Sequence, residues 1–308
     1  MSAWAVRDMP SQAGKLAVVT GATGGLGFET ALGLAQAGAE VILAARNADK
    51  GRDALTRIRA HLPASGVRFE LLDLASLASV ADFAQRLRAG GRAVDLLVNN
   101  AGVMAYPERQ VTADGFEAQL GINYLGHYAL TAQLLPLLHR APTPCVVSLS
   151  SGLHHVGAIH FDDLQLARRY TPNRAYAQSK LAMLMFAFEL QRRSDAQGWN
   201  LLSDAAHPGY SRTDLIANGP GQTGMMWQVS RLLQPIMSQS AAEGALPTLF
   251  AATSPDAKPA GYYGPSGLFE LKGAVKPSRI ATRAKNVADA TRLWDVSHRL
   301  TGVAFKLD

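Results

Sequence analysis

Tyr176 and Lys180 are the two residues of this sequence whose types and spacing most directly suggest chemistry. They stand four positions apart, and the nearly all-apolar stretch 181–190 that follows predicts a buried helix. Residues four apart on a helix share one face, so the phenol and the ammonium can converge on one point. An ammonium beside a phenol lowers the pKa of the phenol from about 10, and such a phenol can exchange a proton during a reaction. The pair alone also fits an ordinary helix with a tyrosine at its apolar edge and a solvated lysine.

A glycine-rich segment near the start of the chain lies between a predicted strand and a predicted helix. Residues 15–20 form a short apolar run, residues 28–37 have a helical pattern, and Gly21-Ala-Thr-Gly-Gly-Leu-Gly27 connects the two. Glycines in this context let the backbone approach a pyrophosphate, which the N–H groups and positive dipole end of the helix then bind. The spacing fits both Thr-Gly-x-x-x-Gly-x-Gly and Thr-Gly-x-x-Gly-x-x-Gly. The motif therefore predicts a dinucleotide site without selecting between two branches of such proteins.

The end of the second predicted strand favours a phosphorylated ribose. Residues 40–45 are followed directly by Arg46, with Lys50 one helical turn later. An acidic residue at this position binds the ribose 2′-hydroxyl of NAD, whereas an arginine suits the 2′-phosphate of NADP. Because no carboxylate precedes Arg46, we expect NADP(H) as the preferred cofactor and NAD(H) as the less favoured one. A solvated arginine at a strand end is the alternative.

Strands and helices alternate along most of the chain. Further strands are predicted at residues 67–72, 94–98, 144–151 and 201–206, and further helices at residues 77–87, 112–119, 122–138, 240–253 and 287–300. A turn at residues 262–267 is expected to lead into a last short strand. The alternation predicts a parallel sheet with a ligand crevice at the carboxyl ends of its strands, where Gly21, Arg46, Asp73 and Asn99 fall.

Residues from about 14 to 215 resemble the short-chain dehydrogenase/reductase family. The residues that carry the resemblance occur in family order: Thr20-Gly21 with Gly25 and Gly27, Asp73, Asn99 to Gly102, Tyr176 with Lys180, Pro208-Gly209 and Thr213. The resemblance implies an α/β fold over residues 1–308, with a single Rossmann-type domain. Its doubly wound parallel sheet would have seven strands with helices on both faces. Residues from about 216 to 308 would form a substrate lid and a C-terminal extension.

The resemblance further implies a nicotinamide cofactor. Asp73 would contact its adenine end, and Pro208-Gly209 would pass under the nicotinamide with Thr213 near the carboxamide. The cofactor-binding residues implied in this way are Gly21, Thr23, Gly24, Gly25, Leu26, Gly27, Arg46, Asp73, Leu74, Asn100, Ala101, Gly102, Tyr176, Lys180, Pro208, Gly209 and Thr213.

The same resemblance implies a catalytic tetrad of Asn123, Ser151, Tyr176 and Lys180, with Ser150 as the fallback for Ser151. In carbonyl reduction the Ser151 and Tyr176 hydroxyls would donate hydrogen bonds to the carbonyl oxygen, where charge builds up. Tyr176 would supply the proton, Lys180 would lower its pKa and hold the nicotinamide ribose, and Asn123 would anchor a relaying water. The expected activity is that of an NADP(H)-dependent alcohol dehydrogenase or carbonyl reductase acting on a small hydrophobic carbonyl or alcohol.

The segment between Ser151 and Tyr176 is long, and with Arg46 it resembles the retinol-dehydrogenase-like and protochlorophyllide-reductase-like branch. That branch leaves reduction of a carbon–carbon double bond open, and a catalytically idle nucleotide-binding scaffold is a further alternative. His154 and His155 in this segment are adjacent and would point apart on regular structure. Because no cysteine or carboxylate joins them and His160 in a ligand set, we expect cleft-lining histidines and no metal.

Composition and charge argue against several other classes of protein. The net charge is +6, but the lysines and arginines are scattered, so a phosphate-bearing cofactor explains the charge better than nucleic acid does. The one cysteine, Cys145, lies in an apolar run, which indicates a small buried hydrophobe and a reducing compartment. Residues 1–12 lack a signal-peptide core, and no apolar run reaches the roughly 18 residues of a membrane span. We therefore expect a cytoplasmic protein.

The C-terminal third of the sequence leaves two questions open. Residues 225–237 predict a helix with methionine and tryptophan on its apolar side, which suits a mobile substrate lid better than a membrane-surface helix or plain core. The family often pairs through the helices that carry Asn123 and Tyr176. A homodimer or homotetramer is therefore expected unless the C-terminal extension covers those surfaces.

Overall fold

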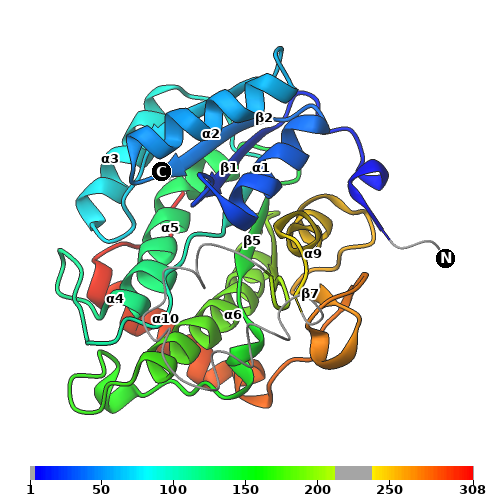
Figure 1. The fold of residues 1–308 in the computed structure, drawn as a ribbon. Coiled ribbons are helices and arrows are strands. Elements are labelled where there is room, and N and C mark those ends of the chain that lie inside the picture. The colour runs from blue at the N-terminus through cyan, green and yellow to red at the C-terminus, as the bar shows by residue number, and fades with distance from the viewer. Residues whose placement is uncertain (1–3, 212–237, 308) are drawn as a thin grey trace.

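The computed structural model describes residues 4–211 and 238–307, and one eight-stranded sheet lies at the centre of this part of the chain (Figure 1). The strand order is β3-β2-β1-β4-β5-β6-β7-β8. Strands β1 to β7 are parallel, and β8 is antiparallel to β7. The strands are β1 (Leu16–Thr20), β2 (Glu40–Ala45), β3 (Val67–Leu71), β4 (Leu96–Asn99), β5 (Cys145–Leu149), β6 (Leu202–Ala206), β7 (Tyr262–Pro265) and β8 (Val275–Pro277).

Helices cover both faces of the sheet, which confirms the predicted doubly wound α/β fold. One face carries α3 (Leu77–Ala89), α5 (Gly126–Leu138) and α6 (Pro172–Gln197), and the other carries α1 (Gly25–Gln36), α2 (Ala48–His61) and α9 (Ala241–Thr253). Alternate side chains of β1 enter the two cores: Leu16 and Val18 the first, Ala17 and Val19 the second. Burial on both faces is the reason why the strands read as continuous apolar runs. None of the helices in the described part of the chain is long and apolar enough to cross a bilayer.

The C-terminal edge of the sheet differs from the prediction. Residues 262–267 were predicted to be a turn, but the first four of them form β7, because Tyr262 and Tyr263 pair with Ala205 and Ala206 of β6. Both tyrosine rings are buried, so tertiary packing outweighs the local turn preference of the Gly-Pro pair that follows. The chain then returns through antiparallel β8, and the sheet has eight strands instead of the seven predicted.

One predicted helix is largely absent. Residues 112–119 include a tight turn at Gly115, whose φ of +83° interrupts a helix, and α4 is reduced to Ala118–Leu120. A π-helical turn, η2 (Gly121–Leu125), joins α4 to α5, and such turns often occur at functional sites. Short 3₁₀ turns complete the described helices: η1 (Val6–Asp8), η3 (Gly152–His155), η4 (Phe161–Asp163), η5 (Leu268–Glu270) and η6 (Thr282–Lys285).

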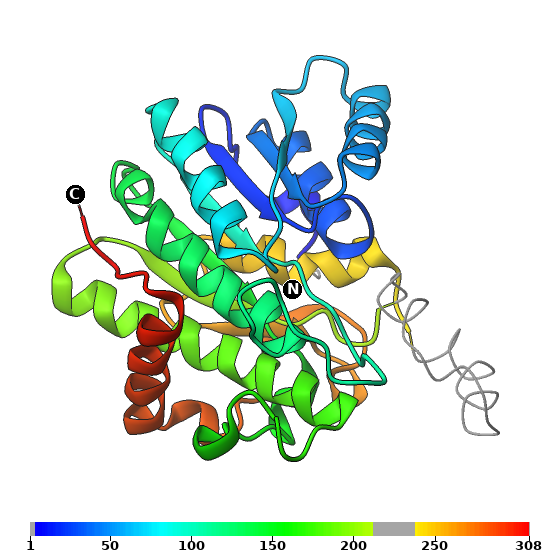
Figure 2. The same cartoon turned by 90° about the vertical axis from the view of Figure 1, so that its left-hand side faces the viewer.

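A C-terminal helix, α10 (Val287–Thr301), packs along α6 (Figure 2). The Tyr124 hydroxyl of η2 and the Ser297 hydroxyl of α10 are 2.7 Å apart, and Trp294 stacks on Phe186 of α6 with ring centroids 5.8 Å apart. The helix therefore covers part of the surface through which a homodimer or homotetramer was expected to form. That assembly stays a prediction.

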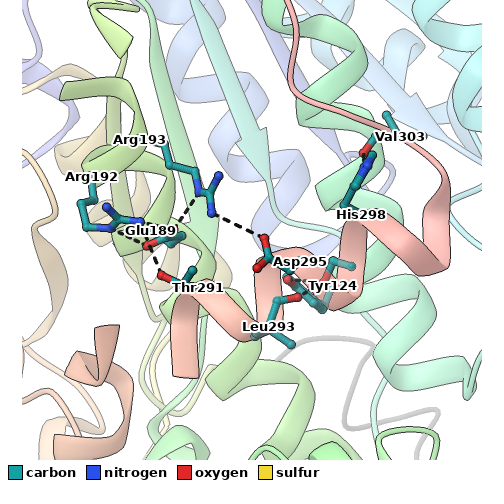
Figure 3. Close-up of polar contacts among 10 residues, drawn as sticks. Tyr124, Glu189, Arg192, Arg193, Thr291, Leu293, Asp295, His298 and Val303 are labelled. Carbon is teal, nitrogen blue, oxygen red and sulfur yellow. Dashed lines mark hydrogen bonds and ion pairs between the residues drawn. The ribbon is translucent and has the colours of Figure 1, made fainter. Parts of the chain in front are cut away.

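Charged side chains reinforce the contact between α6 and α10 (Figure 3). The buried Glu189 carboxylate accepts hydrogen bonds from Arg192 and Arg193, at 2.6 and 2.7 Å. Arg193 also lies 3.9 Å from Asp295 of α10, and its guanidinium lies over the ring of Trp294. The buried carboxylate is thus compensated by two arginines, one of which bridges the two helices.

Trp294→Ala is expected to lower the free energy of unfolding by about 3–5 kcal/mol, because it leaves a cavity in the aromatic cluster between α5, α6 and α10. Urea unfolding measures the change. Val287→Ala, at an exposed position of the same helix, is the matched control and should change stability by less than about 0.5 kcal/mol. Equal, small effects of the two substitutions would show that α10 does not stabilise the fold.

Candidate active site

A large cleft lies at the carboxyl ends of the parallel strands. Its volume of about 1470 Å³ exceeds the roughly 300–1,000 Å³ of a site for one drug-sized ligand, so it has room for a dinucleotide and a second molecule. The predicted site residues that line it are Gly21, Thr23, Gly24, Gly25, Leu26, Gly27, Arg46, Asp73, Leu74, Asn100, Ala101, Gly102, Ser151, Tyr176, Lys180, Pro208 and Gly209. Asn123 is buried behind this lining. Thr213 and the lid predicted at residues 225–237 lie outside the described residues.

The glycine-rich turn after β1 forms a cradle that side chains would fill. Gly21 has a φ of +67°, and a Cβ at this position would lie 2.9 Å from the Cα of Ala101. A Cβ at Gly27 would overlap the carbonyl oxygen of Gly21. Helix α1 starts at Gly25, three residues earlier than predicted, so the free N–H groups of its first turn belong to the glycine-rich segment. This combination fits a bound pyrophosphate.

The Thr20 side chain ties this turn to the loop after β4 and to η2. Its hydroxyl oxygen accepts hydrogen bonds from the N–H groups of Asn100 and Ala101, both at 2.9 Å. It also lies 2.9 Å from Nε2 of the buried His127, whose Nδ1 is 2.9 Å from the carbonyl oxygen of Asn123. Because burial lowers the pKa of His127 to about 4, the ring is neutral at pH 7. Its Nδ1–H then donates to Asn123, and Nε2 accepts from Thr20.

The end of the cleft next to β2 carries basic side chains beside carboxylates, of which Asp53 lies 3.8 Å from Arg57. Arg46 is exposed at the cleft and has no carboxylate partner within residues 4–211 and 238–307. Lys50 also lines the cleft, whereas the nearby Asp49 is paired with Arg52. An unpaired guanidinium at the end of this strand fits a 2′-phosphate, which it can bind through two parallel hydrogen bonds.

The serines in and after β5 have different environments. Ser148 is buried inside the strand, and the Ser150 hydroxyl donates to the carbonyl oxygen of Lys180 at 2.8 Å. Ser151 lines the cleft, and its hydroxyl is close enough to Tyr176 to favour the ionised phenol. Of the two candidate serines, Ser151 is the one that the structure brings together with Tyr176.

Lys180 lies one turn after Tyr176 on α6, but its ammonium binds the backbone. Nζ donates to the carbonyl oxygen of Leu149 at 3.0 Å and lies 5.7 Å from the centroid of the Tyr176 ring. Burial raises the pKa of Tyr176 to about 12, although the neighbouring Ser151 hydroxyl opposes the rise, and burial lowers the pKa of Lys180 to about 8. The prediction that Lys180 lowers the pKa of Tyr176 is wrong for this structure. Desolvation of the phenolate is the larger effect.

Asn123 connects three segments around Lys180. Its Oδ1 accepts from the N–H of Val103 at 2.7 Å, and its Nδ2 donates to the Val103 carbonyl and to the Ser179 hydroxyl, at 3.0 and 2.9 Å. A Cβ on Gly102 would lie 3.3 Å from this Oδ1 and 3.5 Å from Nζ of Lys180, so both groups approach the same point. The Asn123 side chain thus joins η2 to the loop after β4 and to α6.

Only one of the three histidines after Ser151 lines the cleft. It is His155. His154 is buried with Nδ1 2.7 Å from the Ser151 carbonyl, and Nε2 of His160 accepts from Nε of Arg174 at 3.0 Å. The rings of His154 and His155 lie 4.0 Å apart in a 3₁₀ turn, contrary to the prediction that they point apart. Within the described ranges no three metal-ligating side chains gather.

Several residues of the cleft were not predicted from the sequence: Met104, Leu153, His207, Leu268, Phe269, Glu270, Leu271, Lys276 and Arg279. His207 directly precedes Pro208 and could have been found from its position beside the Pro-Gly pair. The residues from 268 onwards belong to no local motif. They reach the cleft because β7 and the antiparallel β8 form its border, which depends on long-range pairing.

Comparisons with known proteins agree with this geometry. Residues 15–220 match the family model for short chain dehydrogenase. The polyprenol dehydrogenase of Mus musculus is 39% identical over 298 residues, which cover 96% of this chain and 86% of that protein. Retinol dehydrogenase 12 of Homo sapiens is 38% identical over 297 residues, with coverages of 95% and 88%. The crystal structure of an uncharacterized protein from Mycobacterium paratuberculosis has 41% identity and a TM-score of 0.82, and covers 99% of this chain and 100% of that chain.

Lys180→Met is expected to stabilise the protein when no nucleotide is present. The lysine pKa falls from 10.5 to about 8 on folding, so the unfolded state binds more protons between these values. Burial of the ammonium therefore costs stability below about pH 8, and the cost disappears as the pH rises towards 10.5. We expect the substitution to raise the free energy of unfolding by about 1–3 kcal/mol at pH 7, after loss of the hydrogen bond to Leu149, and by less at pH 10.

Urea unfolding at the two pH values measures both effects. Lys285→Met, at an exposed lysine of η6, is the control and should leave the free energy of unfolding nearly unchanged. A loss of stability at pH 7 in Lys180→Met would contradict this interpretation of the buried ammonium.

Proposed function

Because this chain belongs to the short-chain dehydrogenase family, we propose that it is an NADP(H)-dependent oxidoreductase that interconverts an apolar alcohol and its aldehyde or ketone. The observation that carries the proposal is that the Ser151 and Tyr176 side chains lie together in a cleft with room for a dinucleotide and a substrate. Two hydroxyls in this position can bind one carbonyl oxygen. A scaffold that only holds a nucleotide has no use for them.

The cleft fits a dinucleotide with a 2′-phosphate. The cradle at Gly21 and Gly27 would take the pyrophosphate beside the first turn of α1. Arg46, which has no carboxylate partner in the described residues, would hold the 2′-phosphate, with Lys50 adding positive charge. NADPH bound there supplies the hydride, while the protein supplies position and electrostatics. Pro208 and Gly209 would border the nicotinamide.

The protonated phenol favours carbonyl reduction. The Ser151 and Tyr176 hydroxyls would donate hydrogen bonds to the substrate oxygen as negative charge develops on it. Since burial holds the pKa of Tyr176 near 12, the phenol carries its proton at neutral pH and can act directly as a general acid. Alcohol oxidation needs the phenolate instead. We therefore propose reduction as the direction that the site favours.

Lys180 would return a proton to Tyr176 after each turnover. A pKa of about 8 means that its ammonium gives up a proton far more readily than an ordinary lysine does. Asn123 would act as a positioning residue, since it holds the loop at Val103 and helix α6 at Ser179 on either side of Lys180.

The substrate that we propose is an apolar alcohol or carbonyl compound. Beyond the Ser151 and Tyr176 pair, the cleft is bordered by the apolar side chains of Met104, Leu153 and Leu268. The relatives at 38–39% identity are named for dehydrogenation of polyprenol and retinol, which are both apolar alcohols. Apolar walls favour such molecules because they remove apolar surface from water.

Tyr176→Phe is expected to lower kcat for NADPH-dependent reduction of decanal by about 10²–10⁴-fold, because it removes the general acid. The dissociation constant of NADPH should change by less than about twofold, since the ring is kept. Stopped-flow or steady-state loss of NADPH absorbance measures the rate, with Tyr106→Phe as the control for loss of a phenol hydroxyl. A variant that keeps more than a tenth of the parent kcat would overturn the assigned role.

Arg46→Ala is expected to weaken NADPH binding by about 10–100-fold and to leave NADH binding unchanged, because only NADPH carries the 2′-phosphate. A fluorescence titration of each nucleotide measures both constants. Arg299→Ala, at an exposed arginine of α10, is the control for loss of one positive charge. Equal weakening of both nucleotides would contradict the assignment of Arg46 to the phosphate.

A further inference from the structure

The turn between β7 and β8 presents two apolar side chains at the border of the cleft. Leu268 and Phe269, which we name the apolar lip, line the cleft and yet are 79% and 83% exposed. Among the large apolar residues of the described chain, these are the two highest exposed fractions. Single exposed apolar residues are common, but an adjacent pair at the edge of a ligand cleft indicates a contact surface.

The backbone of the lip is held in an unfavourable conformation. Phe269 and Glu270 have φ values of +51° and +56°, in the left-handed region that residues with a Cβ rarely adopt. The turn closes through hydrogen bonds from Glu270 N–H to the Gly267 carbonyl at 2.9 Å and from Gly267 N–H to the Lys272 carbonyl at 2.9 Å. Two consecutive residues stay in this region only where the surroundings enforce it, and such residues cluster at functional sites.

The side chain of Glu270 anchors the lip to the loop after β6. Its Oε2 lies 3.3 Å from Nε2 of His207, and its Oε1 accepts from the N–H of Arg279 at 3.1 Å. His207 is buried, and its Nδ1 accepts from the N–H of Gly209 at 3.3 Å. Nε2 therefore carries the ring proton, and it faces both the Ser278 hydroxyl, at 3.0 Å, and the Glu270 carboxylate.

The carboxylate of Glu270 is ionised over the whole range in which the protein would be assayed. Burial opposes its ionisation, but the hydrogen bonds from His207 and from the N–H of Arg279 outweigh that effect and lower its pKa to about 2. A second tie runs from the N–H of Tyr210 to the carbonyl of Leu271, at 2.8 Å. The lip is thus joined through Glu270 and Leu271 to the residues on either side of Pro208-Gly209, which border the proposed nicotinamide site.

We propose that Leu268 and Phe269 determine substrate specificity by holding the apolar chain of the substrate outside the Ser151 and Tyr176 pair. The Glu270–His207 contact acts as a positioning pair that sets the lip against the cofactor loop. This inference rests on the proposed function, because it assigns a task to the same cleft. It implies that the cleft prefers elongated apolar carbonyl compounds, because each further methylene group adds contact with the lip.

The double variant Leu268→Ser with Phe269→Ser tests the lip directly. With NADPH and the aldehydes butanal and decanal, kcat/KM of the parent should rise with chain length. In the variant, kcat/KM for decanal should fall by about tenfold, and that for butanal should change by less than about twofold. Val287→Ser, which removes an exposed apolar side chain from α10, should leave both aldehydes unaffected. The dissociation constant of NADPH, measured by fluorescence, should be the same in all three proteins.

Several outcomes would overturn the proposal. If the ratio of kcat/KM for decanal to that for butanal is unchanged in the double variant, the lip has no role in substrate recognition. If kcat/KM falls equally for both aldehydes and NADPH binds more weakly, the lip only supports the cofactor loop. If the double variant no longer sediments with phosphatidylcholine vesicles while its ratio of kcat/KM for decanal to that for butanal is unchanged, the lip is a membrane contact instead. If the parent reduces neither aldehyde, the proposed function fails. The affinities of the NADP-loaded protein for decanol and for butanol, compared between the parent and the double variant, then test the role of the lip separately.

Glu270→Ala and Glu270→Gln test the positioning pair. Alanine should raise KM for decanal about threefold to tenfold at an unchanged kcat, while glutamine, which keeps an acceptor for the N–H of Arg279, should restore part of the loss. KM for butanal should not move in either variant. A merely structural role would instead lower kcat for both aldehydes and weaken NADPH binding, and that result would contradict the pair's assignment.

Discussion

The contact between the end of β5 and helix α6 is the constraint on which the rest of the site depends. Two hydrogen bonds link the same elements in opposite directions: the Lys180 ammonium donates to the Leu149 carbonyl, and the Ser150 hydroxyl donates to the Lys180 carbonyl. Because these bonds hold the strand against the helix, Ser151 comes to lie beside Tyr176. The arrangement requires an ammonium to be buried, which lowers its pKa and opposes folding at neutral pH. The protein thus retains a group that costs stability at the place where a proton would move in the proposed reaction.

A second set of contacts holds the floor of the cleft. Thr20, His127 and Asn123 connect the glycine-rich turn, the loop after β4 and the π-helical turn η2, and the histidine between them is buried and neutral. Helix α10 supports η2 through the hydroxyl of Ser297, which lies 2.7 Å from the Tyr124 hydroxyl. On the opposite border, Glu270 ties the lip to the loop after β6. The ends of the central strands therefore form the floor of the cleft, and the hairpin of β7 and β8 forms one of its borders.

Patterns that are local in the chain could be predicted from the sequence, and features made by distant contacts could not. The apolar runs predict the parallel sheet because its strands are buried on both faces, and the motifs at Gly21, Arg46 and Tyr176 are each contiguous. The strand at Tyr262 was missed because it forms only by pairing with β6, although its local composition resembles a turn. The pKa of Tyr176 was predicted in the wrong direction because spacing on a helix says nothing about desolvation or about the carbonyl that binds Lys180. Leu268 and Phe269 belong to no motif, and the border of the cleft where they lie depends on the pairing of β7 with β6 and β8.

The measurement that tests the account most directly is the fate of a hydride label in one turnover. The protein would be mixed with NADPH that carries deuterium at C4, in each of the two stereochemical forms, and with 2-decenal, an apolar aldehyde that also contains a carbon–carbon double bond. If the cleft reduces carbonyl groups, deuterium will appear on the carbinol carbon of the product from one of the two labelled forms. Deuterium on C3 of a saturated aldehyde, or no transfer from either form, would contradict the assignment of this cleft to carbonyl reduction.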